Sequence, residues 1–461
     1  MFGILREQFT FNIVYMIKLN ILKYIKEVTI VNKRSFALGI LLIIFVLILN
    51  MTISTSSSYI VAAPEYPSKI RFDDFEEKRN RMEDIDEAFL TNVKKFSYES
   101  ASVILKEQDI KSNSLYSPIS LYMAFAMMAE SSKGDTRQEI LDAIHMNDSG
   151  IIGKETGKLF RKLYFHNEIG KLNLANSLWL NKDIQFNKEF LDRMATDYYS
   201  YSFHVDFDDK DTSKKISDWI SENTGGKLGN SPKDFMANPE QVMVLLNTIY
   251  FYDEWVDRFN ADKTEEDVFY LGDGSTIKCD FMNMIHESHG YVKADGYTSS
   301  YLSFKNGGRM VFILPDEGIS PTDIISDSKW LSEAIDAISS EKSQFGKVIF
   351  KIPKFSYKVQ LDLREHMDRL GIKSAFDINT ADFTPLSKTK PLFVSEVKQS
   401  AAISIDERGC EATAFTQIDY AGSARPEGMA EMILDRPFIF VIIGEDECPL
   451  FLGVINNPKA D

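Results

Sequence analysis

Cysteine is scarce in this chain, with three residues among 461. So few thiols cannot build a disulfide scaffold, and no two of them have the CxxC spacing of a zinc or redox motif. Basic residues are also in the minority, 52 against 68 acidic ones, which gives a formal charge of −16. Nucleic acid is therefore not expected as a partner, because binding to phosphates requires clustered Lys and Arg.

The short motifs of common catalytic sites are missing. The sequence contains no GxSxG, GxxxxGK[ST], HExxH or GxGxxG pattern. His286 and His289 are close in sequence, and we interpret this HESH segment as a surface loop rather than a metal site. Ser117 and Ser120 are interpreted as helix-start residues rather than nucleophiles. The sequence thus predicts a protein that is not an enzyme and that has no cofactor or metal.

The amino-terminal end carries the longest apolar run. Lys33 and Arg34 precede an uncharged stretch over 36–49, and a Ser/Thr-rich exit follows. This pattern is typical of a secretory signal, and 14 apolar residues are short for a spanning helix of about 20. We predict an exported protein, or one tethered to the outer face of a membrane by an uncleaved signal-anchor. The predicted divisions are a basic extension 1–34, a signal peptide or signal-anchor 35–53, a polar linker 54–84 and one domain 85–461.

The body of the chain predicts an α+β fold. Its first half has helical patterns over 92–107 and 211–227, and Thr136 to Glu139 forms a capping box that predicts a helix start. A further helix is expected over 363–372. The second half holds β-branched and aromatic runs that predict strands. These runs cover 242–251, 310–315, 347–355, 438–443 and 450–455.

One tract in the second half is unusual. A predicted strand over 401–407 runs into about 28 residues of small and polar character before the next strand, which is too long for a simple connection. Positions 410, 412, 414 and 416 are small, and more varied residues alternate with them. Period two with one small face is a strand pattern. The tract is therefore predicted to be a loop that is able to become a strand.

Ordered sequence boxes then indicate a family. NSLYSPIS at 113–120 is followed by KGDTRQEIL, LANSLWL, ISDWISENTGGK and VLLNTIYFYDEWVDRF. GIKSAFD, ADFTPLS, IDERGCEATAF, LDRPFIFVI and PLFLGVINNP complete the series. In these boxes the chain resembles the serpins over essentially all of 85–461. The resemblance implies three β-sheets, about nine helices and an exposed reactive-centre loop.

The resemblance also implies a mechanism. A target protease attacks the loop as a substrate and becomes acylated, and the freed amino-terminal half of the loop inserts into the largest sheet as a new strand. The native fold is then metastable, held by a kinetic barrier. The implied partner is a serine protease, with papain-like cysteine proteases as a second class, and the inhibitor is expected to be a monomer. The alternative is a non-inhibitory serpin that acts as a binding or carrier module.

Counting seventeen positions from Glu407, as the family does, places the reactive bond at Ser423–Ala424. Small residues there suit elastase-like or subtilisin-like proteases. Arg425 is a competing site for trypsin-like enzymes, but the Arg425–Pro426 bond would be cleaved poorly because the proline ring obstructs the position after the bond. Tyr420 would suit chymotrypsin-like enzymes but shortens the inserting strand. The expected flanking residues are Tyr420, Ala421, Gly422, Arg425 and Pro426.

Two further residue sets follow from the resemblance. Cys410 replaces the usual Thr or Ser, and Phe415 replaces Ala on the outward face. Gln399 stands where many serpins have a sheet-opening His. The implied hinge is Glu407, Gly409, Cys410, Glu411, Ala412, Thr413, Ala414, Phe415 and Thr416. The implied sheet-opening cluster is Ser117, Ser120, Asn247 and Gln399.

Overall fold

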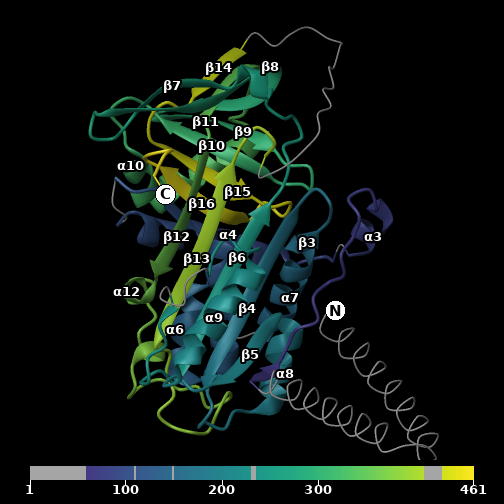
Figure 1. Ribbon diagram of the computed structural model, residues 1–461, viewed down its shortest axis with the longest axis vertical. Coiled ribbons are helices and arrows are strands. Elements are labelled where there is room, and N and C mark those ends of the chain that lie inside the picture. The colour runs from purple at the N-terminus through teal and green to yellow at the C-terminus, as the bar shows by residue number, and fades with distance from the viewer. Residues whose placement is uncertain are drawn as a thin grey trace, which may run out of the picture.

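The computed structural model describes residues 59–81, 83–107, 111–147, 150–229, 235–409 and 428–460. The predicted extension and signal segment, 1–53, lie outside these residues. Within the described part of the chain, no helix is both long and apolar enough to cross a lipid bilayer. The α+β prediction is confirmed: helices dominate the first half, and strands dominate the second (Figure 1).

Ten α-helices lie in the described ranges, near the number implied by the resemblance. Helix α5 is buried along nearly its whole length because it packs between β6 and β16. The bounds of the helices are α3 Phe75–Asn80, α4 Glu87–Leu105, α5 Pro118–Ser131, α6 Gly134–Ala143, α7 Ile152–Leu163, α8 Lys188–Asp197, α9 Lys210–Asn223, α10 Pro321–Ser326, α11 Ser328–Asp336 and α12 Arg364–Met367.

A seven-stranded sheet occupies the lower part of the molecule in the view of Figure 1, in the order β1-β5-β4-β6-β13-β12, with β3 added beside β4. Its central pair β6 and β13 is parallel, whereas β6 pairs with β4 and β13 with β12 in antiparallel register. The strands are β1 Ile60–Ala62, β3 Phe165–His166, β4 Lys171–Asn181, β5 Ser200–Val205, β6 Met243–Tyr252, β12 Phe355–Asp362 and β13 Glu396–Ile405.

A nine-stranded network has the order β14-β11-β8-β9-β10-β15-β16-β2, with β7 beside β8. The 19-residue strand β8 pairs with β7 over its first part, with β11 over most of its length and with β9 over its last part, so it joins two sheets into one network. The strands are β2 Ser114–Tyr116, β7 Glu265–Tyr270, β8 Thr276–Ala294, β9 Tyr297–Ser303, β10 Arg309–Pro315, β11 Gln344–Pro353, β14 Gly428–Ile433, β15 Phe438–Ile443 and β16 Pro449–Ile455.

Apolar side chains cover both faces of the long sheet. The main core packs α5 and its neighbours against one face. A second cluster, which includes Trp179 of β4 and Trp219 of α9, packs against the other face. Because the sheet is covered on both faces, β4 and β6 are buried along nearly their whole length.

Two local predictions were wrong. Helix α6 begins at Gly134, so Thr136 and Glu139 lie inside it and do not cap it. Their side chains bind backbone N–H groups of a neighbouring loop instead: Thr136 Oγ1 accepts from Asp382, and Glu139 accepts from Lys373 and Ser374 at 2.8 Å. The helix expected over 363–372 shortens to the four residues of α12.

The segment predicted as a polar linker makes specific contacts in its described part. Strand β1 pairs with β5 in antiparallel register and forms the edge of the long sheet. The Tyr66 ring lies within 6.2 Å, centroid to centroid, of the rings of Phe160, Tyr164, Tyr199 and Tyr201. Part of this segment is therefore docked on the body, although the division of the chain into domains stays a prediction.

Candidate functional site

The central parallel pair of the long sheet separates at one end. The β6–β13 ladder runs from Val244 and Glu396 to Ile249 and Ala401. Beyond it, β6 continues along β4 and β13 continues along β12. The two strands there line a shallow cavity of about 50 Å³ that includes Tyr250 and Ala402. A segment folding back from the end of β13 would run antiparallel to both strands, which is the orientation with perpendicular ladder hydrogen bonds.

The hinge begins directly above this gap and is held by the segment that follows β6. The backbone N–H of Trp255 donates to the Arg408 carbonyl at 3.0 Å, and that of Phe259 donates to Glu407 at 2.9 Å. The indole Nε1 of the buried Trp255 donates to the Asp406 carbonyl at 3.1 Å. These three bonds fix the path of the chain at the point where it leaves β13.

Gly409 can only be glycine in this arrangement. Its φ is +128°, and a Cβ built there would lie 2.5 Å from the Asp253 carbonyl oxygen and 2.7 Å from Trp255 N. Gly409 also forms an isolated bridge with Glu254. The close approach needs a residue without a side chain and with access to positive φ.

Glu407 is anchored by side-chain contacts. Its carboxylate lies 3.0 Å from the Lys354 ammonium and accepts a hydrogen bond from Thr264 Oγ1 at 2.8 Å. Burial raises the pKa of Glu407, but hydrogen bonds from its own backbone, Lys354 and Thr264 outweigh it, so its pKa lies below the usual value. The ionised form therefore stabilises the start of the hinge.

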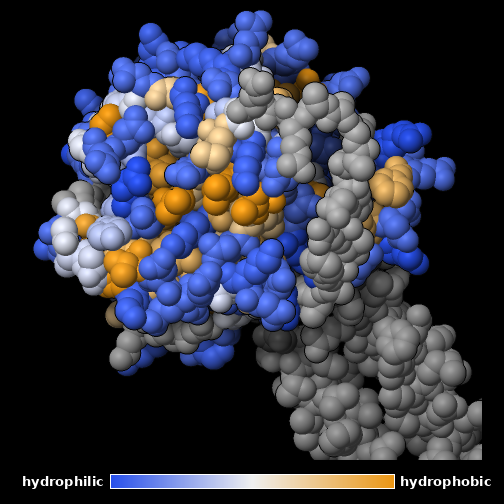
Figure 2. Space-filling model, turned by 90° about the horizontal axis from the view of Figure 1, so that it is seen from above, coloured by the Kyte–Doolittle hydropathy of each residue, from blue (hydrophilic) through white to orange (hydrophobic). Residues whose placement is uncertain are grey.

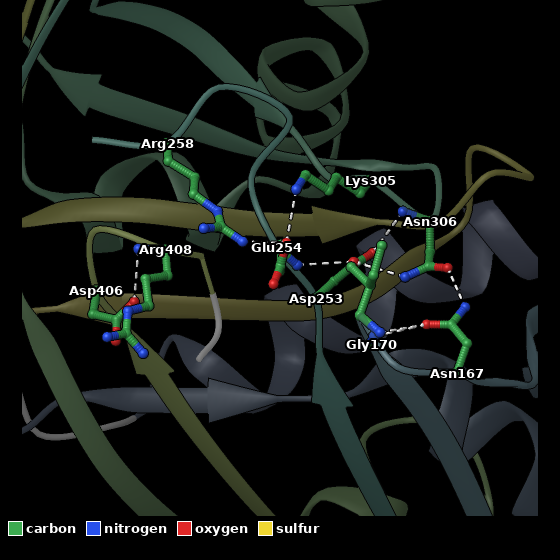
Figure 3. Close-up of polar contacts among 10 residues, drawn as sticks. Asn167, Gly170, Asp253, Glu254, Arg258, Lys305, Asn306, Asp406 and Arg408 are labelled. Atoms are coloured by element: carbon green, nitrogen blue, oxygen red, sulfur yellow. Dashed lines mark hydrogen bonds and ion pairs between the residues drawn. The ribbon is translucent and has the colours of Figure 1, made fainter. Parts of the chain in front are cut away.

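A charged and amide cluster lies beside the start of the hinge, as Figure 3 shows. Glu254 sits between Arg258, at 2.5 Å, and Lys305, at 2.8 Å. Asp253 accepts hydrogen bonds from the side-chain and backbone nitrogens of Asn306, at 2.8 and 3.1 Å. Burial raises the pKa of Asp253 to about 7. These hydrogen bonds favour the charged form and lower the pKa, but burial outweighs them.

The four residues of the implied sheet-opening cluster lie close together and are buried. Ser117 caps α5, and its Oγ accepts from Ser120 N at 3.4 Å. Gln399 accepts from Ser117 N at 2.7 Å and donates to Ser117 O at 2.9 Å. Asn247 lies opposite Gln399 in the β6–β13 ladder. The amide at 399 thus ties β13 to the start of α5, and its role in sheet opening stays a prediction.

Several predicted site residues fall outside the described part of the chain. They include the reactive bond Ser423–Ala424, its flanking residues, and the hinge residues from Cys410 to Thr416. Of the hinge, Glu407 and Gly409 are described, and both lie at the exit of β13.

The interpretation of His286 and His289 as a surface loop was wrong. Both lie in β8, with ring centroids 4.7 Å apart, and both contact the Phe350 ring nearly at right angles. Burial lowers the pKa of both rings, that of His289 to about 4. Within the residues that the structure covers, no group of three His, Cys, Asp or Glu side chains is placed to hold a metal.

Sequence reasoning did not single out several residues of this region, Asn306 among them. Asp253 and Trp255 follow a buried strand directly, and a charge next to an aromatic residue at a strand end was an available signal. Asn176 of β4 lies in the LANSLWL box but was not singled out, and its Oδ1 accepts from Asn247 Nδ2 at 2.5 Å. A polar residue inside an otherwise apolar strand is the pattern that indicates it, because a buried amide needs a partner.

Comparisons with known proteins agree with this geometry. The family described as Serpin (serine protease inhibitor) matches residues 91–458. Alpha-1-antiproteinase of Rattus norvegicus is 29% identical over 363 residues, covering 77% of this chain and 85% of that protein. Alpha-1-antiproteinase of Ovis aries is 29% identical over 362 residues, covering 77% and 84%. The native-state structure of Tengpin, a thermophilic serpin, has a TM-score of 0.71 at 29% identity and covers 86% of this chain and 97% of that chain.

Proposed function

Because the chain belongs to the serpin family, we propose that it inhibits a serine protease by strand insertion. The observation that carries this proposal is the separation of β6 and β13 immediately below the hinge. The segment that begins at residue 410 then has a place in the sheet, antiparallel to both neighbours. Roughly ten new backbone hydrogen bonds, at about 1 kcal/mol net each, would drive the insertion.

The proposed chemistry is a trapped acyl transfer. The protease serine Oγ attacks the carbonyl carbon of Ser423, the bond to the nitrogen of Ala424 breaks, and Ala424 leaves as the new amino terminus. An ester then joins Ser423 to the protease. Insertion of the freed segment carries the protease along before water hydrolyses this ester. The chain itself supplies no catalytic group in this scheme, so we infer that it is an inhibitor and not an enzyme.

The target class follows from the small residues at the proposed bond. Elastase-like and subtilisin-like proteases accept such residues, and papain-like cysteine proteases are the second class. Incubation with elastase or subtilisin should give an adduct that survives a denaturing gel, and the released fragment should begin at Ala424 by mass. Clean cleavage without an adduct, with every serine and cysteine protease tested, would support the binding or carrier alternative instead.

The inserting face has its own test. Ala414 lies on the small face of the tract, so Ala414→Arg forces a charge into the sheet and should convert the inhibitor into a substrate. Phe415→Arg is the matched control, because period two places it on the outward face. An unchanged inhibitory stoichiometry in Ala414→Arg would contradict the assignment of faces.

The position of the bond is tested by specificity. Ser423→Arg should move inhibition toward trypsin-like proteases. If Ser423→Arg leaves the target range unchanged, the reactive bond lies elsewhere in the tract.

We also infer that the monomeric inhibitor acts outside the cell, through export directed by residues 35–53. Either the segment is removed, or it remains as an anchor on the outer face of a membrane. Fractionation of expressing cells, with the amino terminus of the product sequenced, separates these two outcomes. A product found entirely in the cytosol would contradict both.

A further inference from the structure

An apolar patch lies on the solvent face of β8, β11 and β14. It consists of Ile285, Phe345, Ile349 and Met429. Three of these side chains are 55%, 59% and 48% exposed, at Ile285, Phe345 and Met429. Figure 2 views this end of the molecule and shows apolar residues gathered within a mostly hydrophilic surface.

The strand register makes the patch continuous. Ile285 of β8 lies directly opposite Ile349 of β11. Met429 of β14 lies opposite Lys347, between Phe345 and Ile349 on the same face of β11. The neighbouring residues Val348 and Phe350 point inward and are fully buried. The outward face of a sheet open to water is normally polar, so an adjacent apolar group on three strands requires an explanation.

Charges in the patch do not prevent an apolar contact. Lys347 lies 3.9 Å from Glu287 of β8, so this ammonium already has a carboxylate beside it on the same face. Lys347 lies among the apolar residues, and its aliphatic stem adds apolar surface while its paired ammonium stays at the solvent.

The patch is placed where a bound protease would reach it. Strand β14 begins at Gly428, four residues after Ala424. Four extended residues span about 14 Å at most. A protease of about 220 residues has a radius of gyration of about 17 Å. A protease held on the proposed bond therefore has the patch within its reach.

We propose that this patch is a docking surface for the body of the target protease. The partner is a protease with apolar side chains next to its active-site cleft. These side chains would lie on the side of the cleft that binds the residues following the cleaved bond. The inference rests on the proposed function and adds a specificity contact outside the loop. The patch would act when the protease first binds, so its loss should lower the rate of association. It should not change the stoichiometry, which depends on the later competition between trapping and hydrolysis of the ester.

The test uses substitutions matched for residue type and exposure. The double variant Phe345→Ser with Met429→Gln removes apolar surface from the patch. The control is Phe75→Ser with Met236→Gln, whose parent side chains are 67% and 68% exposed and lie elsewhere. The second-order rate of adduct formation with elastase and with subtilisin is measured on the full chain, together with stoichiometry and thermal midpoint.

We expect the patch variant to form adduct about tenfold more slowly with at least one of the two proteases, with unchanged stoichiometry and midpoint. The control should stay within about twofold of the parent. Equal rates for parent and patch variant would overturn the docking surface while leaving the inhibitor function intact. Absence of any adduct with the parent would instead overturn the proposed function. A parent that sediments as a dimer, with a monomeric patch variant, would assign the patch to a second copy of this chain and overturn the proposal.

Discussion

At the scale of single residues, Gly409 combines an unusual backbone conformation with a position at the predicted hinge. Its positive φ and its contact with the Asp253 carbonyl leave no room for a Cβ. Gly409→Ala should lower the free energy of unfolding by about 2–4 kcal/mol, through strain and a backbone clash. Urea unfolding followed by tryptophan fluorescence measures this, since Trp255 packs beside the hinge.

Gly318→Ala is the matched control for this substitution. Gly318 also has positive φ, +89°, but a Cβ there would meet nothing within 4 Å. It should cost only the conformational strain, about 1 kcal/mol. Equal losses in the two variants would show that the close approach at the hinge contributes nothing.

Asp253 is expected to make the stability of the folded protein depend on pH. Its pKa is about 7 in the folded protein against an ordinary 3.8, so the folded state binds the proton more tightly. Its contribution to stability is complete below about pH 4 and is lost as the pH rises through 7, by about 1.4 kcal/mol per unit. Asp253→Asn removes this loss, so the variant should gain stability relative to the parent between about pH 5 and pH 7.5.

Thermal midpoints at several pH values check this expectation. The surface residue Asp206 is a suitable control, because a hydrogen bond from Lys182 lowers its pKa. Asp206→Asn should show no relative gain over this pH range. A constant difference between Asp253→Asn and the parent across the range would contradict the assignment of a raised pKa to Asp253.

At the scale of elements, β13 and α5 are joined through one amide. Gln399 accepts from Ser117 N, and both residues are buried. Gln399→Ala leaves that N–H without this partner and opens a cavity, which should cost about 2–4 kcal/mol of unfolding free energy in urea titrations. Ser400→Ala is the neighbouring control: the Ser400 hydroxyl has no hydrogen-bond partner among the described residues, so its removal should change stability by less than about 1 kcal/mol.

The helices and strands differed in how well their positions could be predicted from the sequence. The five runs predicted as strands match β6, β10, β11, β15 and β16 within a few residues, because β-branched runs bounded by turn residues leave little alternative. Strands β7, β8, β9, β12 and β14 were not predicted. The start of α6 was missed because Thr136 and Glu139 bind a segment more than 200 residues away in sequence, which no local pattern reveals. The same reason explains the His286–His289 error: pairing of β8 with β11 placed those rings against Phe350.

At the scale of the whole molecule, the candidate site has two kinds of residue. Glu407, Gly409 and Gln399 were found because the ordered boxes of the family place them. Asp253 and Asn306 were not found, because their meeting depends on the approach of the segments after β6 and β9. Family resemblance therefore indicated the segment that is proposed to insert, and only the folded structure located the residues that surround its starting point.

The last prediction concerns the stored energy of the native state. A single cut in the loop should let residues from 410 onward enter the gap between β6 and β13, and about 10 kcal/mol of new hydrogen bonding should raise the thermal midpoint on the order of 10 °C. Calorimetry before and after limited proteolysis measures the shift. Cleaved Ala414→Arg is the control, because its buried charge should hold the strand out of the sheet and keep the midpoint close to that of the intact protein. If the cleaved and intact forms of the unsubstituted protein melt at the same temperature, no stability is gained on cleavage. The gap above Ile249 and Ala401 would then have no part in inhibition.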